Sequence, residues 1–196
     1  MRYSPDHKEK TREKVVKTAA RTLRREGPER LAVAGVMAEA GLTHGGFYAH
    51  FASKDALLAA AIEEAFAHGR RRFQEATGGQ AGRAALDAYV DMYVSERHRD
   101  SRERGCPITA LAGDIARQEG EVRAAFDAGV RALAGGLARL LPDQNPALAS
   151  SLLAEMAGAV TLSRAVADPA LSDDLLARSR AAIKARVAAA YDEVQS

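Results

Sequence analysis

Apolar side chains recur every three or four positions along almost the whole chain, which is the spacing of one face of an α-helix. The clearest runs are Val15, Val16, Ala19, Ala20 and Leu23, then Leu57, Leu58, Ala61, Ile62, Ala65 and Phe66, then Leu152, Met156 and Val160, and finally Ile183, Val187 and Tyr191. No stretch alternates apolar and polar residues as a half-buried β-strand does. The pattern predicts an all-α fold.

Glycine and proline residues divide this pattern into about nine helices. The expected helix starts are Asp6, Val33, His44, Ser53, Gln80, Pro107, Gly120, Pro146 and Ser172. Ser53, Asn145 and Ser172 each stand where a side-chain oxygen can cap a helix N-terminus. Short helices in front of long ones predict a three-helix head over residues 1–52 and a larger helical body over residues 53–196, which begins with a connecting helix.

The second and third helices of the head have the spacing of a helix-turn-helix unit. Helices over residues 33–40 and 44–50 are separated by Gly41, Leu42 and Thr43, and a three-residue turn containing glycine is typical of this motif. Gly41 can take the left-handed conformation that ends a helix, and Thr43 can cap the next one. The apolar side chains expected to pack inward are Leu31, Val33, Val36, Met37, Leu42, Phe47 and Phe51.

The second of these two helices has a surface suited to DNA. Gly45 and Gly46 each disfavour the helix by about 1 kcal/mol relative to alanine. Without side chains there, the helix N-terminus and its free N–H groups can approach a phosphate backbone closely. Tyr48 and His50 can donate hydrogen bonds to phosphates, and Lys54 adds a full positive charge.

Charge is distributed unevenly between the two parts of the chain. The net charge is +2, but the first 54 residues hold eleven Lys and Arg against six Asp and Glu, whereas the remainder holds seventeen against twenty. A basic head on an acidic body is typical of a polyanion-binding unit, although charge alone fits a solvated basic helix equally well. With no signal peptide and no uncharged apolar run of about 18 residues, we expect a cytoplasmic protein without a membrane segment.

Residues 27–58 resemble the DNA-binding signature of the TetR family of bacterial transcriptional regulators. The positions that carry the resemblance are Gly27, Val33, Met37, Ala38, Ala40, Gly41, Leu42, Thr43, Gly46, Tyr48, His50, Phe51, Ser53, Lys54, Asp55, Leu57 and Leu58. The resemblance implies that the first three helices bind DNA, that the fourth joins them to an effector-binding body, and that the last two form a four-helix bundle in a dimer. The implied DNA-binding residues are Thr43, His44, Gly45 and Gly46 at the recognition-helix entrance, and Tyr48, His50 and Lys54 on phosphates.

Two positions depart from the family pattern. Ala32 stands where the family usually has Ser or Thr, which caps the second helix and contacts phosphate, and Gly35 lies inside that helix. These departures leave a second interpretation open, in which the chain is a helical ligand-binding or adaptor protein with a degenerate DNA-binding head. An enzyme is disfavoured, because the sequence has no nucleophile elbow, phosphate-binding loop or paired metal motif.

Aromatic, sulfur-containing and charged side chains in the body are candidates for lining an effector cavity. The candidate residues are Phe66, Tyr89, Met92, Tyr93, Cys106, Phe126, Met156 and Arg164. At helical spacing, such side chains also commonly pack in a core. Arg164 is the most specific candidate, because a charge in an apolar segment needs a partner, and an acidic ligand or a carboxylate of a second subunit would supply one.

Cys106 is the only thiol, and it stands at an expected helix start with arginines nearby. Such an environment tends to lower a thiol pKa, so one hypothesis is an electrophile-sensing cysteine, as in some members of the family. The alternative is a small apolar side chain beside Pro107. One cysteine cannot form an internal disulfide or a Cys-rich zinc site, and no paired histidine motif is present, so we expect no metal and no cofactor.

The last two helices, over residues 146–167 and 172–194, carry alanine-rich seams that suit close packing in a homodimer. The expected dimer-interface residues are Leu152, Met156, Val160, Ile183, Val187 and Tyr191. Two recognition helices would bind a palindromic double-stranded operator with half-sites about 34–36 Å apart, or a multiple of that distance. We expect a repressor whose small-molecule effector moves the connecting helix and releases the operator.

Overall fold

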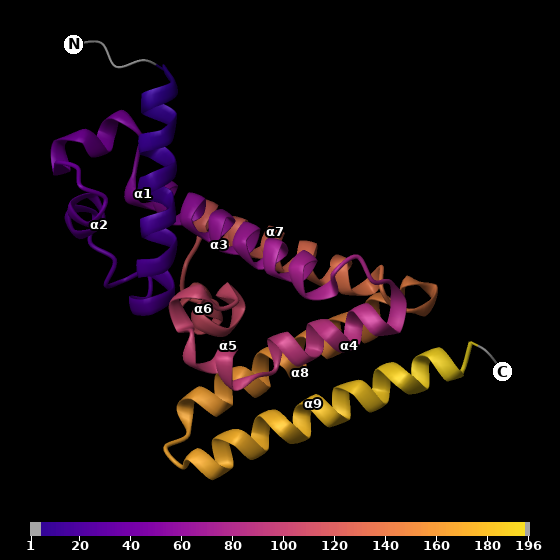
Figure 1. Ribbon diagram of the computed structural model, residues 1–196. Helices are drawn as coiled ribbons and strands as arrows, with labels where there is room; N and C mark the ends of the chain where they lie inside the picture. Colours follow the sequence, from indigo (N-terminus) through magenta and orange to yellow (C-terminus); the bar gives the residue numbers. More distant parts are fainter. Residues whose placement is uncertain (1–4, 195–196) are drawn as a thin grey trace.

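The computed structural model describes residues 5–194, and all regular structure in that range is helical. The α-helices are α1 (Pro5–Glu26), α2 (Val33–Glu39), α3 (Lys54–Thr77), α4 (Gly82–Tyr93), α5 (Glu96–Asp100), α6 (Pro107–Ile115), α7 (Gly120–Ala138), α8 (Pro146–Ala165) and α9 (Pro169–Asp192). Three short 3₁₀ helices are η1 (His44–Ala49), η2 (Arg102–Arg104) and η3 (Pro142–Gln144). The predicted all-α fold is confirmed, and Figure 1 places α1 and α2 at one end of the molecule and α9 at the other.

The head consists of α1, α2 and η1, packed around a small core. One face of α1 is buried through Val15, Ala19 and Leu23, while its other faces carry most of its charged residues. Met37 of α2 and Phe47 of η1 close the core from the opposite side, at 0% and 2% exposure. The inward-facing residues expected from the sequence are buried, except Val33 and Leu42, which are half-buried.

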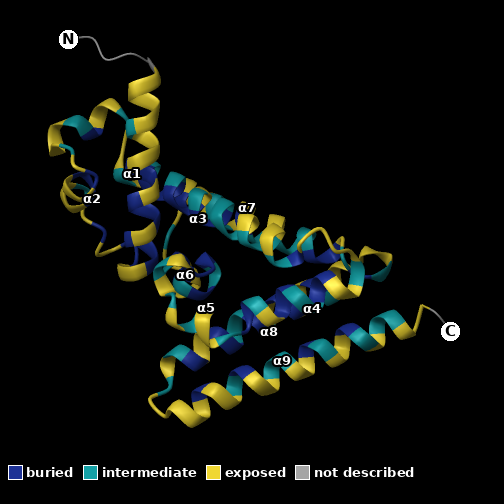
Figure 2. Cartoon of the chain, in the orientation of Figure 1, coloured by how far each residue is buried: buried dark blue, intermediate teal, exposed yellow. Residues whose placement is uncertain are grey.

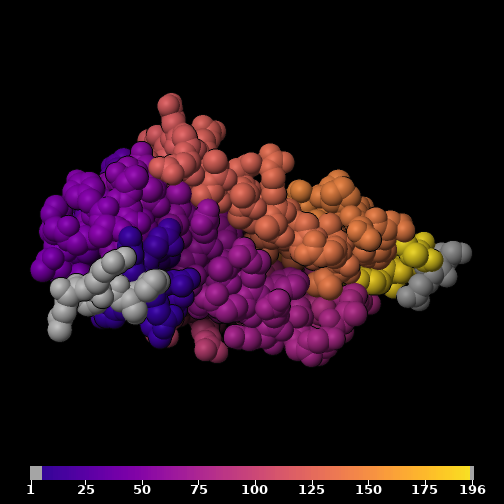
Figure 3. Space-filling model, turned by 90° about the horizontal axis from the view of Figure 1, so that it is seen from above, coloured from indigo at the N-terminus to yellow at the C-terminus, as the bar shows by residue number. Residues whose placement is uncertain are grey.

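The connecting helix α3 begins where expected, because the Ser53 hydroxyl accepts a hydrogen bond from the Ala56 N–H at 2.9 Å. α3 packs chiefly against α1 of the head and α7 of the body, and Figure 3 shows the head and the α3–α7 pair as one continuous surface. The core of the head extends into the body through Leu111, Ile115 and Val122. Head and body therefore share apolar packing. A movement of α3 or α6 relative to the other body helices would change the contacts of the head.

A second core lies between α4, α8 and α9 and the distal parts of α3 and α7. Its largest fully buried side chains include Tyr93, Leu137 and Met156. In Figure 2 the buried positions of α8 and α9 face each other and α4, while the outer side of α9 is exposed. By its length and mean hydropathy, 1.2, α8 could cross a membrane, a test that core helices of soluble proteins also pass, and 44% of that segment is buried inside the chain.

The structure differs from the sequence prediction in one added helix and in several helix boundaries, such as the start of α4 at Gly82 and not at Gln80. The polar segment Glu96–Asp100 forms the short helix α5, which apolar periodicity does not signal. The last helix begins at Pro169 and not at Ser172, because the Asp168 carboxylate accepts a hydrogen bond from the Ala170 N–H at 2.9 Å. Ser172 lies buried inside α9, where its hydroxyl donates to the Ser163 carbonyl at 2.7 Å.

Candidate functional site

The turn of the helix-turn-helix is fixed by backbone hydrogen bonds after α2. The Leu42 N–H donates to the Met37 carbonyl at 2.9 Å, and the Gly41 N–H donates to the Ala38 carbonyl at 2.9 Å. This is the Schellman arrangement, which needs a left-handed residue after the helix. Gly41 has φ +75°, so glycine is required at the position that sets the angle between α2 and η1.

The recognition segment is a 3₁₀ helix rather than the short α-helix expected, which agrees with the low helix propensity of its two glycines. Neither Gly45 nor Gly46 has a positive φ, and an added Cβ at Gly45 would meet nothing within 4 Å. At Gly46 the nearest atom would be Met37 Cε, at an ordinary 3.7 Å. Internal packing therefore does not require glycine at either position. Gly45 leaves the outer surface of η1 bare, whereas a side chain at Gly46 would face the buried Met37.

The proposed contact residues around η1 are mostly exposed. Tyr48 is 72% exposed, although its ring contacts the buried Phe47 edge-on at 5.2 Å between centroids. Thr43 and His44 are exposed at the start of η1, and Lys54 is half-buried at the start of α3. Thr43 occupies the N-cap position but its side chain makes no capping hydrogen bond, so its expected capping role is wrong. Ala32 likewise begins α2 without a side-chain cap.

His50 is less accessible than the sequence suggests. It is half-buried, and its Nδ1 atom is buried without a hydrogen-bond partner in the described structure. Burial lowers the pKa of His50, and the nearby charges of Lys8 and Arg12 lower it further. Lys8 and Arg12 belong to α1, and the Arg12 guanidinium lies 5.0 Å from the centre of the Phe51 ring.

The N-terminal half of α1 therefore adds positive charge beside the recognition segment. Lys14 also approaches it, because its Nζ lies 3.6 Å from where a Cβ at Gly41 would stand. Sequence reasoning did not single out Lys8, Arg12 or Lys14. The signal was the excess of Lys and Arg in the first 54 residues, but the sequence does not say which side of α1 faces the turn.

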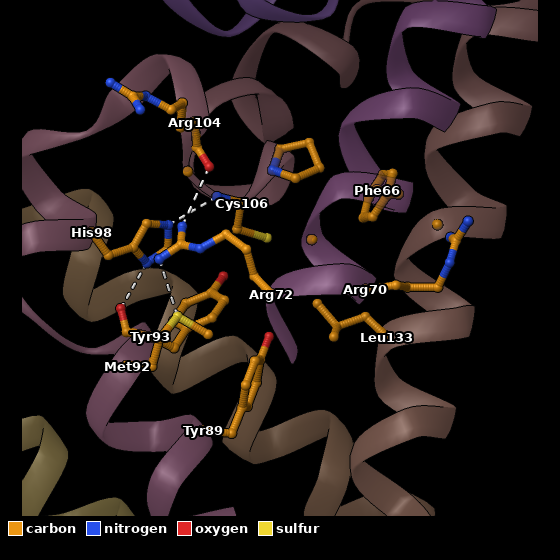
Figure 4. A pocket seen from close by; sticks show the side chains of 14 residues that line it. Phe66, Arg70, Arg72, Tyr89, Met92, Tyr93, His98, Arg104, Cys106 and Leu133 are labelled. Atoms are coloured by element: carbon orange, nitrogen blue, oxygen red, sulfur yellow. Dashed lines mark hydrogen bonds between the residues drawn. The ribbon is translucent and has the colours of Figure 1, made fainter. Parts of the chain in front are cut away.

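A pocket opens in the body between α3, α4, α7 and the segment from His98 to Pro107 (Figure 4). Its enclosed space is about 30 Å³, and the empty volume rises to about 450 Å³ when the open mouth is included. The lining includes five of the eight expected effector residues, namely Phe66, Tyr89, Met92, Tyr93 and Cys106. Residues that sequence reasoning missed are Gly69, Arg70, Arg72, His98, Arg104, Gly105, Pro107, Gly129 and Leu133.

His98 fixes one wall of the pocket. Its Nδ1 lies 2.6 Å from the Tyr93 carbonyl and its Nε2 lies 2.8 Å from the Cys106 N–H. A neutral ring with the proton on Nδ1 donates to the carbonyl and accepts from the N–H, so both contacts are satisfied. Burial lowers the pKa of His98 to about 4, despite the favourable bond to Tyr93. The ring is therefore neutral at physiological pH and holds the Gly105–Cys106 backbone in place.

Comparison with known proteins places this arrangement among bacterial regulators. Residues 15–61 match the family model described as bacterial regulatory proteins, tetR family. An uncharacterized HTH-type transcriptional regulator of Mycobacterium tuberculosis is 30% identical over 168 residues, which cover 78% of this chain and 84% of the relative. The chain belongs to the TetR family of transcriptional regulators.

Solved TetR-family structures share the whole architecture. A TetR transcriptional regulator from Chloroflexus aurantiacus is 27% identical, with a TM-score of 0.75, and the match covers 91% of this chain and 96% of that one. A TetR-family regulator from Cytophaga hutchinsonii has a TM-score of 0.79 over 97% of this chain and 98% of that one. At 17% identity, the second match shows the fold alone.

Three expected effector residues of this TetR-family chain lie outside the pocket. Met156 is 0% exposed in the core between α8 and its neighbours. Phe126 packs edge-on against Phe66 at 5.6 Å between centroids, and its other side lines a separate shallow depression. Arg164 donates to the carbonyls of His98, at 2.7 Å, and Arg99, at 2.8 Å. The expectation that Arg164 needs an acidic partner is therefore wrong, because backbone oxygens satisfy it.

Cys106 lines the pocket but does not have the lowered pKa that its neighbouring arginines suggested. The residue is only 8% exposed, and burial raises the pKa of its thiol above the ordinary value. The Arg104 guanidinium points away from the pocket in Figure 4, so it does not offset the burial. The thiol is therefore protonated at neutral pH, which agrees with the small apolar alternative.

Five of the six expected dimer-interface residues lie inside the single chain. Leu152, Met156, Val160, Ile183 and Val187 are each no more than 1% exposed, because they join α8 to α9 and to the rest of the second core. Tyr191 is half-buried and its hydroxyl donates to the Leu140 carbonyl. The assignment of these side chains to a dimer contact is corrected, since a buried side chain cannot reach a second chain.

One arginine of the pocket and one arginine of the head donate hydrogen bonds to neighbouring carbonyls of the turn η2. Arg72, in the pocket, donates to the Arg104 carbonyl at 3.3 Å. Arg24, at the C-terminal end of α1, donates through Nε to the Glu103 carbonyl at 2.6 Å and is 3% exposed. Burial lowers the pKa of Arg24 to about 10, which still leaves it charged at neutral pH. A displacement of η2 would therefore be felt at both the pocket and α1.

Proposed function

We propose that this TetR-family regulator is a cytoplasmic repressor that binds a pseudo-palindromic operator as a homodimer and is released by a small-molecule effector. The observation that carries the DNA-binding part is the bare outer surface of η1. Gly45 and Gly46 are required neither by backbone conformation nor by packing, and Tyr48 stands 72% exposed beside them. Close approach to a phosphate backbone explains the exposed Gly45 and Tyr48 together.

The proposed DNA-contacting residues are those expected from the sequence, with α1 added. They are Thr43, His44, Gly45, Gly46, Tyr48, His50 and Lys54, together with Lys8, Arg12 and Lys14. The α1 residues supply positive charge without base specificity, so they raise the affinity for any duplex and its dependence on salt. Thr43 keeps a free hydroxyl for a phosphate, because it makes no capping bond.

Replacing Tyr48 or Lys54 with alanine is expected to weaken operator binding about tenfold each, because each change removes one phosphate contact. An operator can be selected from random duplexes, and affinity measured by fluorescence anisotropy at two salt concentrations. Arg139→Ala is the matched control, because Arg139 is exposed at the C-terminal end of α7, the end away from the head. Circular dichroism checks the folding of each variant.

Two results would contradict this contact map. Wild-type affinity in both Tyr48→Ala and Lys54→Ala would remove these residues from the interface. Failure of the wild-type chain to enrich any duplex at low salt would instead favour the adaptor interpretation, in which the head no longer binds DNA.

Operator affinity is expected to fall by about three- to tenfold as pH rises from 6 to 8, through His50. The pKa of His50 lies below its ordinary value in the free protein, because burial, Lys8 and Arg12 disfavour the charged ring. A phosphate beside the ring favours the charged form, so binding takes up a proton, and a rise in pH opposes binding. His50→Gln should flatten the profile, whereas His68→Gln, which lies outside the recognition surface, should not. A flat wild-type profile would rule out this proton uptake.

The pocket beside Phe66, Tyr89, Met92, Tyr93 and Cys106 is the proposed effector site. Its walls come from α3, which leads directly into the head, and from the segment that includes η2. A ligand that displaces Arg72 from the Arg104 carbonyl would loosen the turn that also holds Arg24 of α1. Ligand and operator would then oppose each other reciprocally, through the position of α1 and α3.

The proposed dimer surface is the outer face of α8 and α9, rather than their shared seam. Leu162 and Leu171 are 55% and 45% exposed there, among small side chains such as Ala154, Ala165 and Ala185. Small residues let helices from two chains approach closely. Two chains joined in this way would present their heads to two half-sites about 34–36 Å apart, or a multiple of that distance.

A further inference from the structure

We propose that the pocket takes an aromatic monoanion, of which an aromatic carboxylate is the simplest example. The proposal rests on the pocket being the effector site, and it adds the chemical class of the ligand. The carboxylate would bind the Arg72 guanidinium and the Tyr93 hydroxyl. The ring would lie against the apolar walls of the pocket.

Arg72 is the charge inside the pocket, and its present partners are weak. Figure 4 shows its side chain extending among the lining residues, between Met92 and the backbone of Arg104. The guanidinium donates to the Met92 sulfur at 3.2 Å and to the Arg104 carbonyl at 3.3 Å. A thioether is a poor acceptor and the carbonyl bond is long, whereas a carboxylate matches the guanidinium with two short, charge-assisted bonds. A ligand carboxylate would therefore replace both contacts at a gain.

No carboxylate of the described chain competes for this position. The 14 lining residues include Arg70, Arg72 and Arg104 but no Asp or Glu. The side chains of Arg70 and Arg104 extend outward in Figure 4, so they add long-range positive potential without occupying the pocket. A cationic ligand would face repulsion from Arg72, and a dianion would leave one negative charge unpaired among apolar side chains. One negative charge fits one inward guanidinium.

Tyr93 supplies an independent indication of a polar ligand atom. It is 2% exposed, and its hydroxyl makes no hydrogen bond to a nitrogen or oxygen atom of the described chain; its polar neighbour is the Cys106 thiol, a weak hydrogen-bonding group. A buried hydroxyl with only a thiol beside it gains from a stronger acceptor, so a ligand oxygen is favoured there. Tyr93 lines the pocket, as Arg72 does, and can donate to the same carboxylate.

The remaining walls suit an aromatic ring. Phe66 and Leu133 come from α3 and α7, and the Tyr89 ring packs at 5.6 Å from that of Tyr93 and 4.6 Å from that of Phe73. Aromatic walls favour edge-on and offset contacts with a further ring. The pocket is open at its mouth but its enclosed space is small, about 30 Å³, so the side chains of its walls must move apart to admit a ring.

Isothermal titration calorimetry of the full-length chain with matched acids and amides tests the proposal. The pairs are benzoate and benzamide, trans-cinnamate and trans-cinnamamide, and 2-naphthoate and 2-naphthamide, in which the amide keeps the shape but not the charge. We expect the acid of the best pair to bind at least about tenfold more tightly than its amide. Arg72→Gln should remove about tenfold or more from the acid and less than about twofold from the amide.

Tyr93→Phe should weaken the acid by about three- to tenfold, since it removes one hydrogen bond. Arg123→Gln is the control, because it removes the same charge from an exposed position outside the pocket. Equal affinity for acid and amide would overturn the proposal, as would no heat for any pair at millimolar concentration or equal losses in Arg72→Gln and Arg123→Gln. Operator binding, followed by fluorescence anisotropy, tests the release mechanism separately from the ligand class. An acid that binds through Arg72 without weakening operator binding would support the ligand class and contradict the release mechanism.

Discussion

Replacing Arg164 with methionine is expected to lower the free energy of unfolding by about 3 kcal/mol. Arg164 projects from α8 and donates to the carbonyls of His98 and Arg99, which are among the last carbonyls of α5 and have no partner within that helix. It also donates to the Thr109 hydroxyl at 2.9 Å, so one guanidinium joins α5, α6 and α8. Methionine fills a similar volume but leaves these oxygens without a protein donor.

Urea denaturation followed by circular dichroism measures this loss. Arg164→Lys should recover only part of the stability, because a single ammonium group cannot reach three directions at once. Arg102→Met is the control, since Arg102 is an exposed arginine nearby whose positive charge repels that of Arg164. A change within about 0.5 kcal/mol for Arg164→Met would show that the guanidinium is not a structural clamp and would return it to the list of ligand-binding candidates.

The sequence could predict the features that depend on neighbours close along the chain. Gly41 could be assigned to a left-handed position from its place after an apolar helix, and its φ of +75° confirms this. The caps at Ser53 and Asn145 are also local, and both side chains accept the expected N–H, at 2.9 and 3.0 Å. Gly41 lies in the DNA-binding head and Ser53 directly follows it, which is why the family could be identified from about thirty residues, whereas Asn145 caps α8 in the body.

The effector site could be predicted only in part, because it depends on contacts between distant segments. Arg164 looked like a ligand-binding residue since its acceptors, 55 to 66 positions away, belong to α5 and α6. α5 has the sequence ERHRD, which has no apolar periodicity, and it depends on the Ser95 cap and on Arg164. The run Arg70-Arg71-Arg72 likewise shows three charges, but only the fold shows that Arg72 lies inward while Arg71 pairs with Glu64 at 2.8 Å.

The alanine-rich seams of α8 and α9 show a different limit. Small and apolar residues at helical spacing indicate that two helices pack closely, but the spacing is the same whether the partner belongs to the same chain or to another one. Here the largest side chains, such as Ile183 and Val187, are used inside the chain. A second chain can contact only the outer face of α8 and α9, which carries smaller side chains. A search for large apolar positions therefore selects the buried seam and not this outer face.

Replacing Gly129 with alanine is expected to lower the free energy of unfolding by about 2 kcal/mol and to reduce ligand binding in the pocket. Gly129 is buried in α7, and an added Cβ would overlap the ring of Phe66 on α3. α3 and α7 are long helices fixed along their length, so the ring is expected to move rather than the backbone. Phe66 lines the pocket, and a displaced ring would occupy space that the proposed aromatic ligand needs.

Two further variants test whether the loss comes from overlap with the Phe66 ring or from any glycine-to-alanine change in a helix. Gly113→Ala, in α6, places a methyl group where nothing lies within 4 Å, and it should stabilise the helix by about 0.5–1 kcal/mol. Phe66→Leu removes the ring that the new methyl group meets, so the double variant should be more stable than the sum of the two single changes predicts, by about 1–2 kcal/mol. Strict additivity in this cycle would mean that the Phe66 ring does not set the cost of the new methyl group, and Gly129→Ala would then leave ligand binding in the pocket unchanged.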